Sequence, residues 1–452
     1  MPFSPTDSTI YAPLFSAPSL ADIFSDQQFV RDMLTVEAAL AEVQGRLGVI
    51  PEAAAAEIVA GASALEVDLD ALQAGVEQAG VPIIELVRQL RGQVGPEAAG
   101  YVHWGATTQD IVDTALVLQM RAALEQIEPV LLAVITNLAG LAEQHRTTLM
   151  AGRTHSQQAL PIPFGLKAAG WLAPLLRHRQ RLIELKPRLL VVQFGGAAGT
   201  LASLGDNGAA VQAALAEALQ LGAPAVPWHT QRDNLAEAAG WLSLVSGSLA
   251  KMAQDIILLA QTEVGEVRES ADTARGGSST MPQKRNPIIS ELIIAAARTN
   301  AGLLSALHQA LVQEHERATH GWQVEWLTLP QMFALTGSAL NKARYLSENL
   351  VVDSDRMQQN VAASNGLILA EAINFALTDY MARTEAKQLI KEAVQVALDQ
   401  NRHLVDVVRD KVDAPLDWPA LKDEAAYFGS ANLFIDRVLA EAAQAATTPA
   451  KI

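Results

Sequence analysis

The amino-acid sequence predicts an all-α protein built around long, bundled helices. Apolar residues recur at alternating spacings of three and four over residues 235–259 and again over residues 289–310. A period of about 3.5 residues is typical of helices that pack side by side at shallow angles. Alanine and leucine, which both favour helix, are abundant. No comparable run of alternating β-branched residues is present, so we expect any sheet to be minor.

Helix-breaking residues and helix length divide the chain into three predicted regions. Residues 1–104 hold helices interrupted by prolines, residues 105–350 hold the long helices, and residues 351–452 hold shorter ones. Many seam positions of the central helices are alanine, which allows close approach between helices. The apolar surface of this bundle predicts further burial between subunits, with a self-sufficient monomeric bundle as the alternative.

Charge and composition limit the classes of function. Acidic residues outnumber basic ones 49 to 33, for a net charge of −16, which argues against a general affinity for nucleic acid or anionic membranes. The absence of cysteine excludes disulfides and thiolate chemistry. The first residues lack the pattern of a signal peptide, and every apolar run is broken well before 18 residues. We therefore expect a cytoplasmic protein with no membrane-spanning helix.

The segment with the most chemical information is residues 276–287, Gly-Gly-Ser-Ser-Thr-Met-Pro-Gln-Lys-Arg-Asn-Pro. Two glycines give its backbone access to positive φ, and two hydroxyls, a lysine and an amide follow within a few residues. Asn286 and Pro287 predict a helix start, with Asn as the N-cap and Pro at the first helical position. The segment thus predicts a loop, spanning about residues 275–287, that presents donors and a potential base from a rigid helix. A polar surface linker is the alternative.

Four further segments concentrate polar residues beyond the needs of a plain bundle: 103–113, 152–158, 228–234 and 314–320. The first predicts a capped helix start, which also suits a carboxylate ligand. The last contains two histidines five residues apart, whereas helical zinc motifs need a spacing of four. We therefore expect no metal site, and no sequence pattern indicates a cofactor.

The signature-like loop resembles that of the fumarase/aspartase superfamily, Gly-Ser-x-x-Met-Pro-x-Lys-x-Asn, and fills every fixed position. Segments 103–113 and 152–158 precede it in the order of the other two superfamily regions, so the resemblance covers most of the chain. It implies three mostly helical domains, with the central helices of four subunits forming a twenty-helix core. It also implies a homotetramer whose active sites each collect segments from three subunits and bind a small polycarboxylate.

The resemblance also assigns roles to individual residues. Ser278 matches the loop serine taken as the general base, and His155 matches the histidine on the leaving-group side. Lys284 completes the catalytic set as a donor to the enolate-like intermediate. The expected substrate-binding residues are His103, Thr107, Thr108, Arg153, Thr154, Gln231, Arg232, Ser279, Asn286 and Arg317.

Within the superfamily, the chain looks most similar to the cycloisomerases of aromatic-compound breakdown through the β-ketoadipate pathway. The strings that carry this similarity are residues 103–107, 228–233, 313–317 and 322–326. These enzymes add a carboxylate of a conjugated tricarboxylate across a double bond of the same molecule. Because a carboxylate oxygen leaves without a proton in the reverse direction, we expect a smaller catalytic role for His155 than in relatives that release an amine.

Two alternatives remain open at this stage. Adenylosuccinate lyase shares much of the framework, but Trp322 and Trp326 stand where that enzyme would hold a nucleotide phosphate with Ser and Arg. Tryptophan cannot neutralise a phosphate dianion, whereas arginine binds one through two hydrogen bonds. A helical scaffold that kept the fold and lost activity is the more distant alternative.

Overall fold

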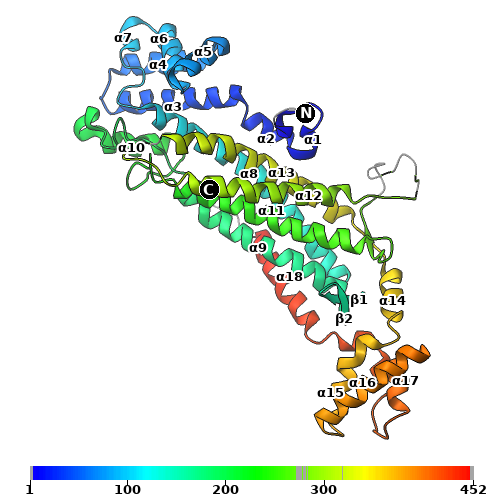
Figure 1. Ribbon diagram of the computed structural model, residues 1–452. Helices are drawn as coiled ribbons and strands as arrows, with labels where there is room; N and C mark the ends of the chain where they lie inside the picture. The colour runs from blue at the N-terminus through cyan, green and yellow to red at the C-terminus, as the bar shows by residue number, and fades with distance from the viewer. Residues whose placement is uncertain (1–3, 271–276, 278–280, 282, 318, 448–452) are drawn as a thin grey trace.

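The computed structural model describes residues 4–270, 277, 281, 283–317 and 319–447. Within these ranges the chain forms eighteen α-helices and four short strands, so the predicted all-α class is confirmed. The molecule is elongated, with the N-terminal helices at one end, the long helices in the middle and α15 to α17 at the other end (Figure 1).

The N-terminal helices pack around α3, which spans Asp26–Arg46 and is capped by Ser25. Helix α3 lies close to α4: a Cβ atom at Gly45 would be 2.5 Å from the Cβ of Ala55, so glycine permits this approach. The buried face of α3 and its neighbours forms a core of aliphatic side chains. The other helices of this region are α1 (Ala12–Phe15), α2 (Pro18–Ile23), α4 (Glu52–Ala64), α5 (Leu69–Ala79), α6 (Ile83–Gln93) and α7 (Pro96–Ala99).

Five long helices form the central bundle, as the apolar period predicts. On α11 the seam residues Leu235, Leu242, Leu249 and Ile256 are at most 1% exposed, which confirms the three-and-four spacing. Helices α11, α12 and α13 pack against one another, and α8 packs against both α9 and α13. The five helices are α8 (Thr108–Gln144), α9 (Phe164–Leu189), α11 (Asp233–Leu259), α12 (Ile288–Gln309) and α13 (His320–Asn349).

The sheet content is minor, as expected. Strands β1 (Leu149–Thr154) and β2 (Gln157–Pro163) form an antiparallel hairpin between α8 and α9. The two turn residues, His155 and Ser156, both have positive φ, at 48° and 64°, as a two-residue type I′ turn requires. Strands β3 (Val267–Arg268) and β4 (Val351–Val352) form a second antiparallel pair.

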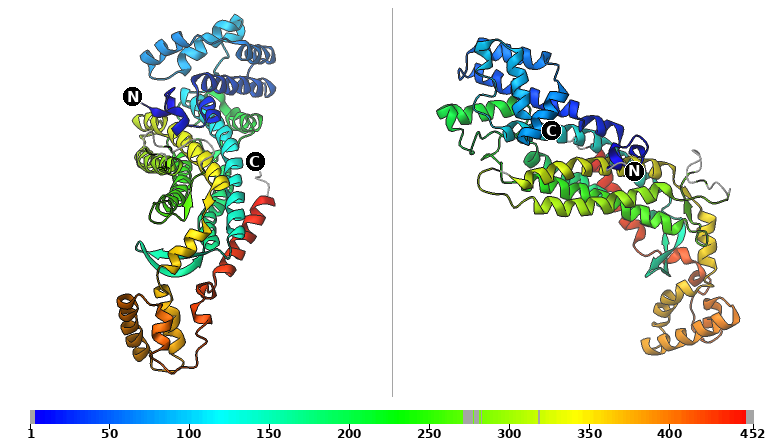
Figure 2. Two further views of the ribbon diagram at one scale, coloured as in Figure 1. Left: turned by 90° about the vertical axis from the view of Figure 1, so that its right-hand side faces the viewer. Right: turned by 45° about the horizontal axis from the view of Figure 1, so that its top comes forward.

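The C-terminal helices lie beyond the bundle, except for the last one. Helix α18 returns along α8 and α9 (Figures 1 and 2). The N-terminal core likewise takes in Phe194 and Leu215 from the central region, so the boundaries near 104 and 350 stay predictions. The remaining helices are α10 (Gly208–Ala218), α14 (Ser354–Ala362), α15 (Ala370–Leu377), α16 (Arg383–Gln400), α17 (Leu404–Arg409) and α18 (Ala431–Thr447), with 3-10 helices at Pro5–Asp7, Ala202–Asn207, Leu367–Leu369, Ala420–Lys422 and Glu424–Tyr427.

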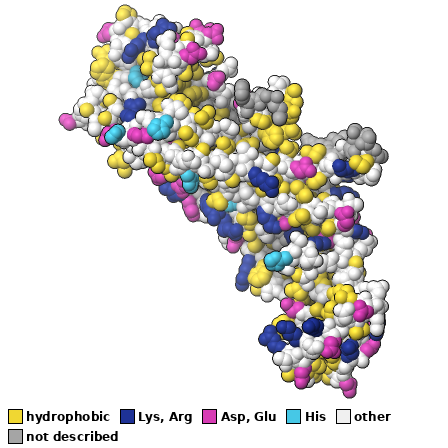
Figure 3. All heavy atoms as spheres, viewed as in Figure 1, with side chains coloured by type: hydrophobic (Ala, Val, Ile, Leu, Met, Phe, Trp, Pro, Cys, Tyr) yellow, Lys and Arg dark blue, Asp and Glu magenta, His cyan; other side chains and the backbone are white. Residues whose placement is uncertain are grey.

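Three central helices, α8, α11 and α12, are long and apolar enough by length and composition to cross a membrane. An average over 18 residues tolerates the polar residues that interrupt each apolar run, so composition alone does not test the expectation of no membrane-spanning helix, which stays a prediction. Less than half of each apolar window is buried within the chain. Leu244 and Leu258 of α11 and Leu327 of α13 are about half exposed or more, and apolar side chains lie among charged ones on the face shown in Figure 3.

Candidate active site

The structure brings several of the predicted site residues together at opposite ends of the bundle, where they are joined by Gln109 and Glu266, which the sequence did not predict as site residues. The cap cluster, at the start of α8, comprises His103, Thr107, Gln109 and Arg317. The hairpin cluster, beyond the end of α8, comprises Arg153, Thr154, His155 and Glu266. Since α8 has 37 residues, the two clusters are separated by about 55 Å along its axis. One chain therefore cannot bring both clusters to one small substrate.

Arg317 lies over the first turn of α8 in the cap cluster. Its Nη1 donates to Thr107 Oγ1 at 2.5 Å, and its Nε donates to Gln109 Oε1 at 3.1 Å. The segment between α12 and α13 supplies this arginine, so the cluster joins parts of the chain about two hundred positions apart. Arg317 is half-buried and, together with the N-terminal dipole of α8, makes this end of the helix attractive to an anion. Thr108, the first residue of α8, is half-buried beside it.

Asp110 holds the backbone beside the cap cluster in place through its buried carboxylate. Its carboxylate accepts from the backbone N–H groups of Gly195 and Gly196, both at 2.9 Å, and contacts His229 Nε2 at 2.7 Å. It also accepts from the backbone N–H of Thr107. Asp110 lies in the first turn of α8, and its fully buried side chain fixes the glycine segment beside Arg317.

Arg232 does not belong to the site, and its assignment to substrate is wrong. Its guanidinium is paired with Asp113 at 2.6 and 3.1 Å and with Glu325 at 2.9 and 2.5 Å, and the residue is only 2% exposed. It also lies over the ring of Trp228, 4.7 Å from the centroid. Burial lowers the pKa of Arg232, and the two facing carboxylates raise it by more. This arginine ties α8, the start of α11 and α13 together.

The neighbouring tryptophans are also structural. Trp322 is 4% exposed and donates its Nε1 hydrogen to Asp113 Oδ1 at 2.9 Å. Trp326 packs edge-on against Trp322, with their ring centroids 4.7 Å apart. Gln231, by contrast, is exposed and donates to Thr230 Oγ1, so its role in substrate binding stays a prediction.

Arg153 of the hairpin cluster is already occupied by a carboxylate. It donates from both terminal nitrogens to the fully buried Glu266, at 2.8 and 2.6 Å, and Asn360 donates to the same carboxylate at 2.8 Å. The expectation that Arg153 binds substrate is therefore replaced by a structural role: it ties the hairpin to β3. This ion pair holds the exposed residues Thr154 and His155 at the tip of the hairpin in place.

The described residues of the signature-like loop, 277, 281 and 283–287, come between the end of α11 and the start of α12, at the hairpin end of the bundle. Ser278 and Ser279 lie outside the described residues, so their roles stay predictions. Lys284 is exposed, Asn286 is half-buried, and Gly277 pairs with Arg285 across the loop. None of these positions contradicts the expected roles of Lys284 and Asn286.

The predicted helix start at Asn286 is wrong in its cap. Helix α12 begins at Ile288, and Pro287 occupies the cap position without a side-chain hydrogen bond. The carboxylate of Glu269 accepts instead from the backbone N–H groups of Ile289 and Ser290, at 3.2 and 2.9 Å. Asn286 therefore does not cap α12, and Glu269 holds together the two ends of the segment that contains the loop.

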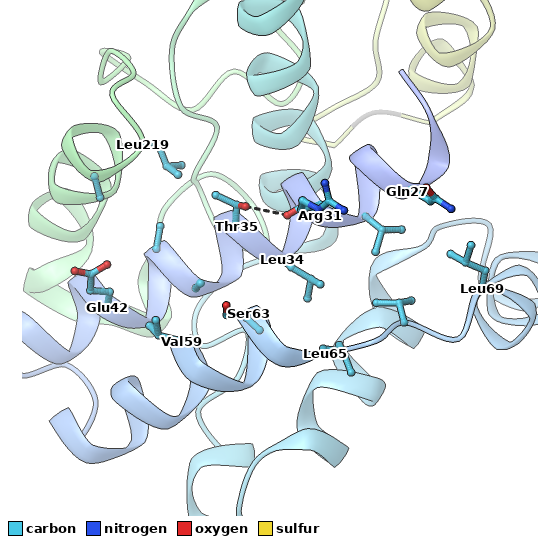
Figure 4. Close-up of a pocket in the computed structure, with 16 residues that line it drawn as sticks. Gln27, Arg31, Leu34, Thr35, Glu42, Val59, Ser63, Leu65, Leu69 and Leu219 are labelled. Carbon is cyan, nitrogen blue, oxygen red and sulfur yellow. Dashed lines mark hydrogen bonds between the residues drawn. The ribbon is translucent and has the colours of Figure 1, made fainter. Parts of the chain in front are cut away.

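Other features of the described residues do not compete with these clusters. No group of three or more His, Asp or Glu side chains in the described ranges could hold a metal ion. A hollow of about 680 Å³ lies among α3, α4 and the end of α10 (Figure 4). Leu34, Thr35 and Val59 contribute to its lining, but no predicted site residue does.

Comparison with known proteins identifies the class of protein to which this chain belongs. A family model described as "Lyase" matches residues 15–302, and the chain belongs to this lyase family, the fumarase/aspartase superfamily. The 3-carboxy-cis,cis-muconate cycloisomerase of Pseudomonas aeruginosa is 48% identical over 94% of this chain and 95% of its own length. The crystal structure of the 3-carboxy-cis,cis-muconate lactonizing enzyme from Pseudomonas putida is 43% identical, with a TM-score of 0.92 over 97% of this chain and 100% of that chain. Trans-aconitate decarboxylase 1 of Mycosarcoma maydis is 43% identical over 96% of this chain and 89% of its own length.

The two arginines are expected to respond differently to substitution. Arg232→Gln leaves Asp113 and Glu325 as uncompensated buried charges, so we expect it to lower the free energy of unfolding by about 3–5 kcal/mol. Arg317→Ala is expected to change stability by less than about 1 kcal/mol and to raise the KM for a polycarboxylate. Urea unfolding and steady-state kinetics measure both effects. If Arg232→Gln raised KM at unchanged stability, the substrate-binding assignment would return.

Proposed function

We propose that this chain converts 3-carboxy-cis,cis-muconate to 4-carboxymuconolactone, an isomerisation in aromatic-compound catabolism. The observation that carries the proposal is a complete signature loop within a chain that is 41–48% identical, over nearly its whole length, to several proteins named for this reaction. The substrate is a small, flat tricarboxylate, which suits a site of short polar side chains and isolated cations.

In the proposed reaction, a carboxylate oxygen of the substrate attacks a double bond of the same molecule. A proton is added at the neighbouring carbon, so all atoms are retained and nothing is released. The species that is hardest to form is the aci-carboxylate, in which negative charge spreads onto a carboxylate that is already charged. Fixed donors stabilise such a species by about 3–4 kcal/mol each. Lys284, Asn286 and Ser279 are the proposed donors.

Ser278 is the proposed proton carrier at carbon, as a hydroxyl in the lactonising direction and an alkoxide in reverse. A free serine is too weak a base for this step, so it has to be activated when water leaves the site. His155 has the lesser role of orienting the attacking carboxylate and neutralising its charge. A carboxylate with a pKa near 4 leaves in the reverse reaction without a general acid.

We also propose a homotetramer with shared active sites. The separation of about 55 Å between the cap and hairpin clusters supports sharing, because a substrate of a few ångströms needs groups from both. The uncovered apolar surface of α8, α11 and α12 supports burial between subunits. A cytoplasmic location is part of the proposal, since a triply charged substrate does not cross a bilayer unaided and has to be consumed where it is made.

Two other activities serve as comparisons. A C–N lyase that acts on adenylosuccinate would need a phosphate site, whereas Trp322 is buried against Asp113 at the corresponding position. Decarboxylation of trans-aconitate is favoured by one observation, the 43% identity to the decarboxylase from Mycosarcoma maydis. Both trans-aconitate and 3-carboxymuconate are tricarboxylates with a double bond. The positions of the positively charged side chains therefore do not distinguish between these two substrates.

The test is incubation of the purified protein with each of the three substrates. With 3-carboxy-cis,cis-muconate we expect loss of the ultraviolet absorbance of the conjugated diene and appearance of the lactone by NMR. Adenylosuccinate should yield no AMP, and trans-aconitate should yield no carbon dioxide. Turnover of trans-aconitate alone would replace the proposed function with the decarboxylase activity.

The roles of Ser278 and His155 predict unequal losses. Removal of a general acid or base costs about 10²–10⁴ in rate, which is the loss in kcat expected for Ser278→Ala. His155→Gln is expected to lose less than about tenfold, because it removes only orientation and charge neutralisation. Stopped-flow or steady-state absorbance measures both, and equal losses in the two variants would contradict the division of roles.

Shared sites predict complementation between two weakened variants. Ser278→Ala removes the proposed proton carrier and Arg317→Ala alters the cap cluster, so if different subunits supply the two groups, random mixing leaves about a quarter of the sites with both groups intact. Co-expressed subunits assayed at low substrate should therefore exceed the mean activity of the two separate variants. An activity equal to that mean would show that each site belongs to one subunit.

A further inference from the structure

His103 of the cap cluster contacts a buried carboxylate, that of Glu37, which the proposed reaction does not use. Nδ1 of His103 lies 2.6 Å from Oε1 of Glu37. The Glu37 side chain is 1% exposed, whereas the His103 side chain is 17% exposed. Glu37 comes from α3 in the N-terminal region, 66 positions away in the chain, so the pairing is not a local consequence of the loop.

The backbone around His103 is held by two helices, α3 and α6. His103 has a φ of 65°, which is uncommon for a residue with a side chain, and such conformations persist only where the surroundings impose them. Gln44 of α3 donates to the carbonyl of Trp104 at 2.8 Å, and Arg91 of α6 donates to the carbonyl of Val102 at 3.2 Å. The imidazole is thus fixed through its ring and through the backbone on both sides.

The remaining ring nitrogen of His103 is the one free to meet a ligand. Nδ1 faces Glu37, and within the described ranges no side chain pairs with Nε2. The chain contains a comparable pair, His229 with Asp110 at 2.7 Å, but His229 is 3% exposed and has no access to a ligand. Of these two carboxylate–histidine pairs, the Glu37–His103 pair is the one that reaches the surface of the cap cluster.

The charges around His103 favour its protonated form. Burial lowers the pKa of His103, while Glu37 raises it through its charge and its hydrogen bond. Asp110 of α8 raises the pKa further, Arg91 of α6 lowers it, and the net shift is upward. A raised pKa means that the imidazolium persists to a higher pH than in an unperturbed histidine and is lost as the pH rises through the shifted value.

We propose that Glu37 is a positioning residue that holds His103 as an oriented imidazolium, whose Nε2–H donates to a carboxylate of the substrate. The inference rests on the proposed function for the identity of that substrate. In a protein with a net charge of −16, a cation fixed in this way supplies local positive charge for a polyanion. Glu37 itself stays behind the ring and touches no substrate.

The first test is Glu37→Gln, which keeps the shape of the side chain and removes its charge. We expect KM at pH 7.5 to rise roughly tenfold, the factor that one unit of pKa represents, with kcat within about twofold. The alkaline limb of kcat/KM should move to lower pH by about one unit. Glu37→Asp, which restores the charge, should return the limb toward its original position.

The matched control is Glu128→Gln. Glu128 is also a buried carboxylate in an ion pair, 2.7 Å from Lys186, but it lies within α8 away from the cap cluster. Its neutralisation should lower stability without moving the pH profile. If Glu128→Gln and Glu37→Gln moved the alkaline limb equally, or if neither moved it, Glu37 would be a structural residue and the proposal would be wrong.

A direct titration separates this inference from the proposed function. We would follow the His103 ring by NMR against pH in the tetramer, with His103→Gln to assign the signal and propane-1,2,3-tricarboxylate as the anionic probe. The wild-type pKa should lie above 6.5 and rise further with the probe. A wild-type value below 6.5, or one that the probe leaves unchanged, would overturn the proposal even if Glu37→Gln fails to fold. Failure to consume 3-carboxymuconate, with this titration as expected, would remove only the proposed substrate.

Discussion

The length of α8 is the constraint on which the rest of the site depends. A rigid helix of 37 residues holds Thr107 at one end and the His155 hairpin beyond the other, about 55 Å apart. No rearrangement of loops within one chain closes that distance. The apolar faces of the same helices are incompletely covered by the chain itself. The exposed apolar faces and the distance between the two clusters both follow from these long helices, and the proposed association of subunits would account for both.

A second constraint is electrostatic, because an acidic protein has to bind a polyanion. Not every arginine near the site serves that purpose: Arg232 is committed to Asp113 and Glu325, and Arg153 is committed to Glu266. Buried carboxylates hold these two guanidinium groups in place, and the ion pairs tie separate elements of the fold together. Breaking such a pair would leave an uncompensated buried charge. Among the predicted site residues that the structure describes, Arg317, His103 and Lys284 are at least partly exposed and can supply positive charge to a ligand.

The fold could be predicted from sequence because its signal is local. The apolar spacing along α11 and α12 repeats every three or four residues, and a helix follows from that spacing alone. The site was harder to predict from sequence, because the role of each side chain depends on hydrogen-bond and ion-pair partners that are distant in the chain. Arg232 lies 119 positions from Asp113 and 93 from Glu325, so its polar neighbours in sequence gave no sign of its burial.

The same reason explains the error at the start of α12. Asn286 and Pro287 are good local cap signals, but the carboxylate that caps the helix comes from Glu269, 20 positions upstream of Ile289.

The proposed role of Glu37 also depends on a partner that is distant in the sequence, namely His103. Nothing in the neighbourhood of Glu37 in the sequence distinguishes it from other acids on an amphipathic helix, and only the fold places it behind His103. An isolated imidazole would be about neutral at physiological pH and would add little attraction for a carboxylate. A buried carboxylate behind it changes both its charge and its direction, while the pair stays electrically neutral from a distance. The pair therefore adds a directed donor to the cap cluster without altering the overall negative field, which is the kind of local exception that an acidic enzyme needs to hold an anionic substrate.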